Sequence, residues 1–114
     1  MTIIRKQTGA ILSALVEYNG VVYLAGVTAD DKTASVKAQT ENILAKIDER
    51  LEMAGTDKTK LLTATVYVSD ISLKAEMNAA WTAWLDPASV PTRACVAVGL
   101  DGGADVEIVV SAAK

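Results

Sequence analysis

Apolar residues recur along this chain with two different periods, and the shorter period predicts the strands. β-branched and other apolar residues gather in short runs bounded by Gly, Asn, Asp or Pro, as is typical of strands. Asn19-Gly20 separates the first two runs, and this dipeptide is a strong signal for a tight β-hairpin. The pattern predicts strands at residues 13–18, 21–27, 61–68, 93–100 and 106–112.

The longer period predicts two amphipathic helices. Residues 34–54 carry apolar side chains at helical spacing with Lys, Glu and Asp between them, and Gly55 is a natural helix end. A second helix is expected to begin near Asp70 or Ser72 and to end before the prolines of "DPASVP". The apolar positions are Val36, Ile43, Leu44, Ile47 and Leu51 in the first helix, and Leu73, Met77, Ala80, Trp81, Trp84 and Leu85 in the second.

The order of these elements predicts the fold class. A β-β-α-β-α-β-β order over residues 1–114 indicates one α+β domain, a mixed sheet with both helices on one face. The strands at 21–27, 61–68 and 93–100 are apolar on both sides, as in strands that are covered on both faces. Because two helices cover only one face, we expect the other to meet a second copy of the chain in a homo-oligomer. A monomer with an exposed apolar face is the alternative.

Composition narrows the function classes. The net charge is −3 and the three arginines are scattered, whereas a nucleic-acid surface needs clustered Lys and Arg. With no histidine, a Ser-His-Asp triad, a Cys-His pair and a histidine-ligated zinc site are excluded. There is no run of 18 apolar residues and no signal-peptide pattern, so we expect no membrane contact. A single cysteine cannot form an internal disulfide, and we expect a cytoplasmic protein.

Two charged residues interrupt the last apolar strands, Arg93 and Glu107, and they are the candidates for chemistry. A guanidinium or a carboxylate is costly to place in a strand unless something binds it. If the last two strands formed a hairpin about Gly103, Glu107 would lie opposite Gly99 and about 20 Å from Arg93. Our hypothesis is that the two groups, if they serve one reaction, meet across a subunit boundary.

Each candidate residue also has a purely structural interpretation. Arg93 could form an ion pair at a strand edge, and Glu107, which points away from its apolar neighbours, could lie on a solvated face. Cys95 shares the face of Arg93 and could be a small core residue. Asn78 could be a surface residue of the second helix, and Trp81 could belong to the helix core.

The stretch "VPTRACVAVGLDGGADVEIVV" resembles the C-terminal signature of the Rid/YjgF family, the reactive intermediate deaminases. That signature begins with Pro or Ala, a small residue, an arginine, a second small residue and often a cysteine. An apolar strand, a short gap and a hydrophobic–Glu–Ile or –Met step follow. The matching residues are Pro91, Thr92, Arg93, Ala94, Cys95, Glu107 and Ile108. "TATVYVSDISLKAEMNAAWTAWL" is similar to the family's strand, acidic turn and helix, with Asn78 followed by Trp81. The resemblance runs from "YLAGV" to the end of the chain.

The resemblance implies a chorismate-mutase-like fold and a homotrimer with three sites in the clefts between subunits. Active members hydrolyse enamine or imine forms of amino acids, such as 2-aminoacrylate, to 2-keto acids and ammonia, which limits metabolite damage, and they use no metal or organic cofactor. Carried onto this chain, Arg93 would bind the substrate carboxylate with two hydrogen bonds. Glu107 would position the attacking water and transfer protons. Cys95, Asn78 and Trp81 would line the pocket.

Two positions depart from the family pattern. Many deaminase members have a tyrosine where this chain has Leu12, and Ser or Thr where it has Ala25, so two hydroxyl donors are missing. The chain is closer to a short, divergent branch that keeps the arginine. Two other functions stay open: a non-catalytic trimer that binds a small carboxylate or a partner, and an endoribonuclease or translation inhibitor. The acidic composition and the absence of histidine disfavour the second.

Overall fold

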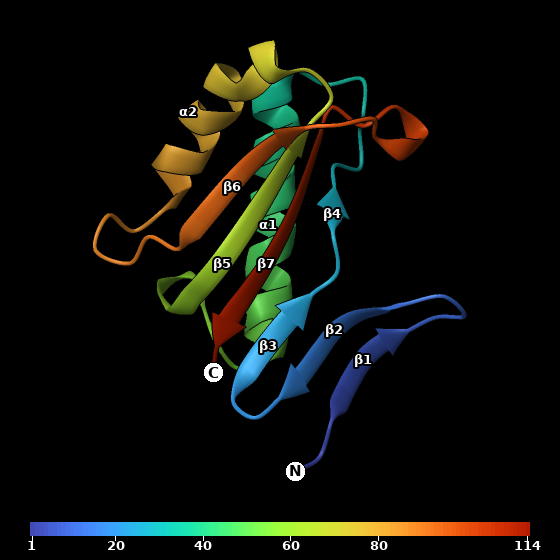
Figure 1. Ribbon diagram of the computed structural model, residues 1–114, viewed down its shortest axis with the longest axis vertical. Helices are drawn as coiled ribbons and strands as arrows, with labels where there is room; N and C mark the ends of the chain where they lie inside the picture. The colour runs from blue at the N-terminus through green and yellow to red at the C-terminus, as the bar shows by residue number, and fades with distance from the viewer.

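The computed structural model describes residues 1–114 and confirms the predicted α+β fold class (Figure 1). One mixed sheet has the strand order β1-β2-β3-β7-β5-β6, with β4 also paired to β7. Only β5 and β6 are parallel; the other pairs are antiparallel. The elements are β1 (Ile4–Thr8), β2 (Ser13–Tyr18), β3 (Val21–Leu24), β4 (Val27–Thr28), α1 (Val36–Met53), β5 (Leu61–Val68), α2 (Lys74–Trp84), β6 (Thr92–Ala97) and β7 (Val106–Ala113).

The structure has four strands before the first helix, where the sequence pattern predicts two. β1 is an edge strand with the sequence IRKQT, and its mostly exposed side chains give no apolar run that would mark it. The predicted strand at 21–27 is interrupted at Ala25 and Gly26, so that its first part, β3, pairs with both β2 and β7 and its second part, β4, pairs with β7 alone. The predicted element order is therefore incomplete, although the fold class is right.

The last two strands do not form the hairpin on which the separation of Arg93 and Glu107 was calculated. β5 lies between β6 and β7 and pairs with both of them. A 3₁₀ turn at Asp101–Gly103 carries the chain from the sheet edge past β5, and both of its glycines have positive φ. The predicted hairpin is wrong because β5, which comes much earlier in the sequence, lies between β6 and β7 in the sheet.

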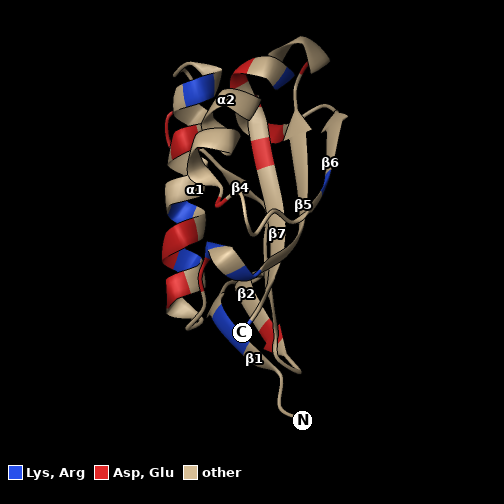
Figure 2. Ribbon diagram, turned by 90° about the vertical axis from the view of Figure 1, so that its left-hand side faces the viewer, with Lys and Arg blue, Asp and Glu red and all other residues tan.

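Both helices cover one face of the sheet, as predicted (Figure 2). In α1 the Ser35 hydroxyl caps the first turn by accepting a hydrogen bond from the Ala38 N–H at 3.1 Å, and Gly55 follows the helix with φ 79°. The apolar stripe of α1 packs against the sheet, and Figure 2 shows its charged residues on the outer side. The core formed there includes Leu15, Val22, Ile43, Leu44, Ile47, Leu51, Val66, Met77 and Ile108.

The second helix begins later than expected because a 3₁₀ turn, Ile71–Leu73, precedes it. Asp70 caps this turn by accepting a hydrogen bond from the Ser72 N–H at 2.8 Å. At the other end of α2, the Lys58 ammonium donates to the Trp84 carbonyl at 2.6 Å and lies 5.2 Å from the Trp84 ring centroid. A cation at this position satisfies a free carbonyl and complements the helix dipole, so Lys58 fixes the C-terminal end of α2, while Asp70 fixes the turn that leads into its N-terminal end.

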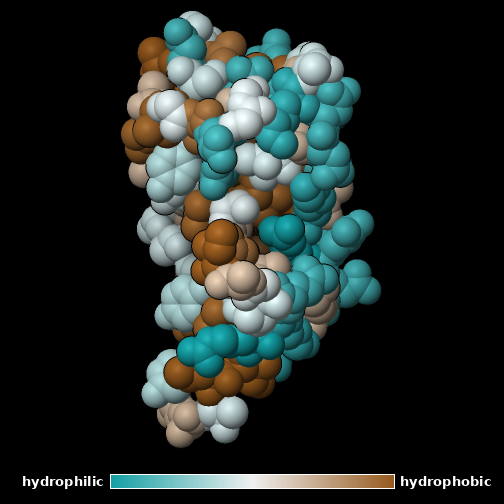
Figure 3. Space-filling model, turned by 90° about the vertical axis from the view of Figure 1, so that its right-hand side faces the viewer, coloured by the Kyte–Doolittle hydropathy of each residue, from teal (hydrophilic) through white to brown (hydrophobic).

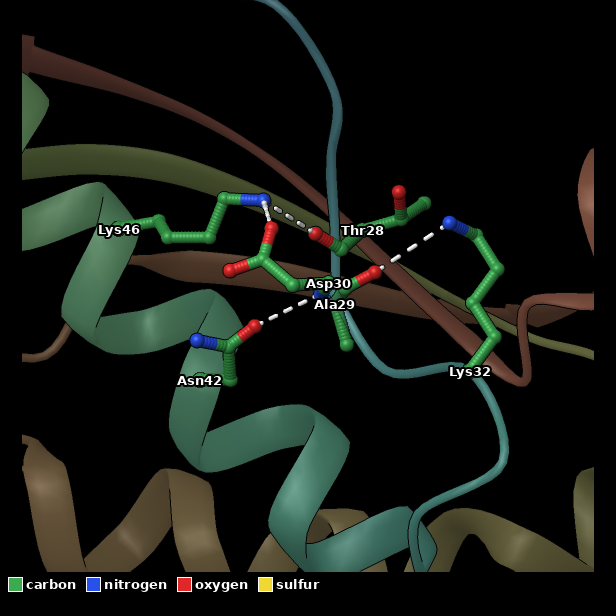
Figure 4. A network of polar contacts seen from close by, with 6 residues as sticks. All are labelled: Thr28, Ala29, Asp30, Lys32, Asn42 and Lys46. Carbon is green, nitrogen blue, oxygen red and sulfur yellow. Dashed lines mark hydrogen bonds and ion pairs between the residues drawn. The ribbon is translucent and has the colours of Figure 1, made fainter.

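Polar contacts attach the segment after β4 to α1 (Figure 4). The Lys46 ammonium donates to the Thr28 carbonyl at 2.8 Å and pairs with the Asp30 carboxylate at 2.9 Å. The Asp30 N–H donates to the Asn42 side chain at 2.9 Å. These bonds hold Thr28 in place against β7, where it lies opposite Glu107.

The other face of the sheet, which we call the open face, is not covered within the chain. Its side chains include Tyr23, Thr65, Tyr67, Val96 and Val109, which are half-buried or exposed. Seen edge-on in Figure 3, hydrophilic colour gathers on the helix side at the right, while the open face at the left mixes pale and brown surface. The homo-oligomer that would cover this face stays a prediction. No helix of the chain combines the length and the apolar character that a membrane span requires.

Candidate functional site

Arg93 lies on β6 beneath α2, on the face of the sheet that the helices cover. Its register partner Ala64 is buried against the helices, and paired residues share a face. The Arg93 Nη1 donates to the Asn78 Oδ1 at 2.7 Å and approaches the Met77 sulfur at 4.0 Å. The Arg93 Cζ lies 5.5 Å from the centroid of the Trp81 ring, within the range of a cation–π contact. The structure thus brings three predicted site residues together.

The Arg93 guanidinium has no carboxylate partner within the chain. The two ion pairs join Lys46 to Asp30 and Lys114 to Glu17. A guanidinium carries five N–H donors in a rigid fork, and Asn78 takes only one of its nitrogens. The half-buried side chain therefore keeps donors that a carboxylate could accept.

The positions of Trp81 and Asn78 suggest that they hold the arginine in place. Trp81 is only 5% exposed and belongs to the hydrophobic core, so its buried ring gives the guanidinium a fixed surface to lie against. Asn78 is half-buried and fixes one guanidinium nitrogen. Cys95 lies two residues after Arg93 on the same face, as a free thiol packed against the edge of the core.

Glu107 lies on the open face and is separated from Arg93. Its neighbours Val106 and Ile108 are fully buried on the helix side, so alternation along β7 directs Glu107 the other way, as the sequence predicted. Arg93 aligns with Ala64 and Glu107 with Tyr67, which puts the two charges two strands apart and about 10 Å apart along the strands, on opposite faces. One chain does not bring them together. The hypothesis that they meet across a subunit boundary stays a hypothesis.

The Glu107 carboxylate lies against Gly26, a residue that the sequence reasoning did not include in the site. A Cβ added at Gly26 would be 2.0 Å from the Glu107 Oε2, closer than any real contact. Ala25, where a hydroxyl is missing, precedes this glycine in the break between β3 and β4. A glycine inside an apolar strand often marks a close approach, and this signal could have identified Gly26.

The remaining features do not form an enclosed site within one chain. Leu12 is 59% exposed in the loop between β1 and β2. A hollow of about 250 Å³ lies between α1 and α2, but none of the predicted site residues lines it. No group of three or more His, Cys, Asp or Glu side chains could hold a metal ion.

Comparison with known proteins gives the family of the chain. Residues 5–114 match the family described as Endoribonuclease L-PSP. The RutC family protein YoaB of Escherichia coli K12 is 39% identical over 100 residues, which cover 88% of this chain and 87% of that protein. The crystal structure of a YjgF family member from Neisseria meningitidis has a TM-score of 0.94 and 36% identity, covering 100% of this chain and 96% of that one.

A member of the Rid protein family from Yersinia pestis, YyfA, has the same fold, with a TM-score of 0.87 and 28% identity over 94% of this chain and 90% of that one. These matches extend beyond the C-terminal motif that carries Arg93 and Glu107 to nearly the whole length of the chain. The chain therefore belongs to the endoribonuclease L-PSP family, which is the Rid/YjgF family that its C-terminal motif resembles.

Proposed function

We propose that this protein hydrolyses imine and enamine forms of small amino acids, such as 2-aminoacrylate, to 2-keto acids and ammonia, and so limits damage by these reactive metabolites. The observation that carries the proposal is the setting of Arg93. Its guanidinium is fixed by Asn78 and backed by Trp81, yet it has no carboxylate partner within the chain. A charge held in this way is suited to bind the carboxylate of a small substrate.

The reaction needs only water and one residue that transfers protons. Arg93 binds the substrate carboxylate, and Glu107 accepts a proton from a water molecule as the water oxygen bonds to the imine carbon. The C=N electron pair moves to the protonated nitrogen. In the second step Glu107 returns its proton to the nitrogen, the C–N bond breaks and ammonia leaves. The hydroxyl proton then passes to the Glu107 carboxylate as the carbon–oxygen bond becomes the carbonyl of the keto acid, and Glu107 gives this proton to the departing ammonia or to solvent.

This chemistry requires an oligomer, and we propose a homotrimer. Arg93 and Glu107 lie on opposite faces of the sheet, so a site with both residues takes one from each of two chains. The open face carries partly exposed apolar side chains that a second copy could cover. The single free cysteine suits the reducing cytoplasm, where we place the protein.

The decisive experiment measures imine hydrolysis directly. An amino-acid oxidase or a lyase generates the imine in situ, and its disappearance is followed with and without this protein. We expect the wild type to release keto acid faster than the spontaneous reaction, and Arg93→Ala to lower kcat/KM by about 10- to 150-fold through loss of a charged hydrogen bond. Arg93→Lys should also be impaired, because an ammonium cannot form the two-bond contact.

Arg50→Ala is the matched control, since Arg50 lies in the last turn of α1 and should leave the rate unchanged. Equal imine lifetimes with and without the wild-type protein would overturn the proposal.

Binding without turnover is the second candidate function. It is favoured by the apolar residues Leu12 and Ala25, which supply no hydroxyl donor. In that case a 2-keto acid would bind in an Arg93-dependent manner while imines decay at the spontaneous rate. RNA cleavage, which the family description names, receives less support, because the net charge is −3 and the chain has no histidine for acid–base catalysis.

A further inference from the structure

The two strands that flank Glu107 each place a hydroxyl side chain beside it. Thr28 of β4 and Tyr67 of β5 lie directly opposite Glu107 in the sheet register. Directly opposite residues share a face and have Cβ atoms about 4.5–5.5 Å apart. The open face therefore carries a row in which a carboxylate lies between an alcohol and a phenol.

The Thr28 and Tyr67 hydroxyls form no hydrogen bond within the chain, unlike the hydroxyls of another row on the same face. Thr63 and Ser111 use their hydroxyls on each other at 2.5 Å, and the Thr92 hydroxyl donates to a main-chain carbonyl. The contact of Thr28 with Lys46, by contrast, uses the main-chain carbonyl of Thr28 and leaves its hydroxyl unbonded. Thr28, Glu107 and Tyr67 are all half-buried, so a small molecule can reach them while much of their surface is shielded.

The row is held in place at the β4 side. The Lys46 and Asn42 side chains attach the segment after Thr28 to α1, as Figure 4 shows. The Glu107 carboxylate leans against the bare Cα of Gly26. Hydroxyl groups beside the Glu107 carboxylate, on strands that these contacts hold in register, can orient a water molecule before it reacts, which lowers the entropic part of the barrier.

We propose that Tyr67, with Thr28 on the other side, is a positioning residue that holds the water molecule activated by Glu107. This assignment rests on the proposed hydrolase function. The phenol donates a hydrogen bond to the water oxygen, and the water gives its proton to Glu107 as its oxygen bonds to the imine carbon. Tyr67 keeps its own proton throughout. Phenol and alcohol groups suit this role because each can donate and accept.

The test compares Tyr67→Phe and Thr28→Val with Tyr23→Phe in the imine hydrolysis assay. Tyr23 is the matched control, since it lies on the same face opposite Ser111 and away from Glu107. For Tyr67→Phe we expect kcat to fall about tenfold, the effect of one lost hydrogen bond, with KM changed by less than about twofold. Thr28→Val should lower kcat less, and Thr28→Ser should restore it.

Two results would overturn the assignment alone: full kcat in Tyr67→Phe while Arg93→Ala is impaired, or a fall in kcat that is matched by a lower melting temperature or a loss of oligomer. A wild-type protein without activity would instead overturn the proposed function and this assignment together.

Discussion

At Gly26, a side chain of a single carbon would collide with the Glu107 carboxylate, because the added Cβ would lie 2.0 Å from Oε2 and 3.0 Å from Cδ. The residue is not among the glycines with positive φ, so its backbone can accept alanine. The requirement for glycine therefore comes from the contact with Glu107 and not from the backbone. The atom that must give way is the end of a flexible side chain, which can rotate at little cost.

We predict that Gly26→Ala folds with a stability loss below about 1 kcal/mol but loses most of its activity, since the displaced carboxylate no longer meets the water molecule. Urea unfolding and the imine assay measure the two effects. Gly99→Ala is the control, because no atom lies within 4 Å of the added Cβ there. An active Gly26→Ala variant would show that the position of Glu107 is not critical.

The sequence predicts the orientation of a single residue where a local pattern determines it, but it does not predict which distant residues lie beside it. The orientation of Glu107 followed from alternation, because its two neighbours are apolar and buried. The grouping of Arg93 with Asn78 came from the family resemblance, since no local pattern reports that β6 lies under α2. Thr28 and Tyr67 were missed because they become neighbours of Glu107 only through the register of three strands.

At the scale of elements, the strongly periodic segments were predicted well and the weakly marked ones were not. Helix α1 has a full apolar stripe and a serine cap, and its predicted limits are within two residues of the observed ones. Strand β1 was missed because it has no apolar run. The turn signal at Asn19-Gly20 reports the pairing of β2 with β3, and no such signal reports the pairing of β2 with β1. The assumed hairpin of β6 and β7 failed because nothing in the local sequence tells that β5 lies between them.

The Asp70 carboxylate caps the turn that leads into α2, the helix of Asn78 and Trp81, and it makes the stability of the protein depend on pH in the acid range. Hydrogen bonds from the Ser72 side chain and backbone lower the pKa of the Asp70 carboxyl below its usual 3.8. A lowered folded-state pKa stabilises the protein at pH values above the unfolded-state pKa, and this stabilisation is lost as the pH falls through the folded-state value.

We therefore predict that the stability difference between wild type and Asp70→Asn is constant above about pH 5 and disappears as the pH falls below about 3.8. Urea midpoints measured across this range would show it. Ser72→Ala should raise the pKa of Asp70 toward its usual value in an NMR titration. An Asp70 that titrates at 3.8 or above in the wild type would contradict the prediction.

For the whole molecule, the open face connects the fold with the proposed chemistry. The helices bury one side of the sheet, while the other side exposes Tyr23 by 51% and Val96 by 42%. The same uncovered face carries Glu107, whereas Arg93 lies at the outer strand on the opposite side. A second copy seated on the open face would bury these apolar side chains, and the proposed two-chain site requires that an Arg93 from another chain reach Glu107 in the same assembly.

We predict a mass in solution of three times the 12.0 kDa of one chain, measured by light scattering coupled to size exclusion. Val96→Glu should shift the protein toward monomer and abolish imine hydrolysis at once, because a carboxylate buried at an apolar interface without a partner is strongly unfavourable. Ile71→Glu is the control, since Ile71 is also exposed, by 56%, but precedes α2 away from the sheet. A monomeric wild type that still hydrolyses imines would contradict this prediction. Arg93 would then act without Glu107 of another chain, and the reaction would not depend on the oligomer.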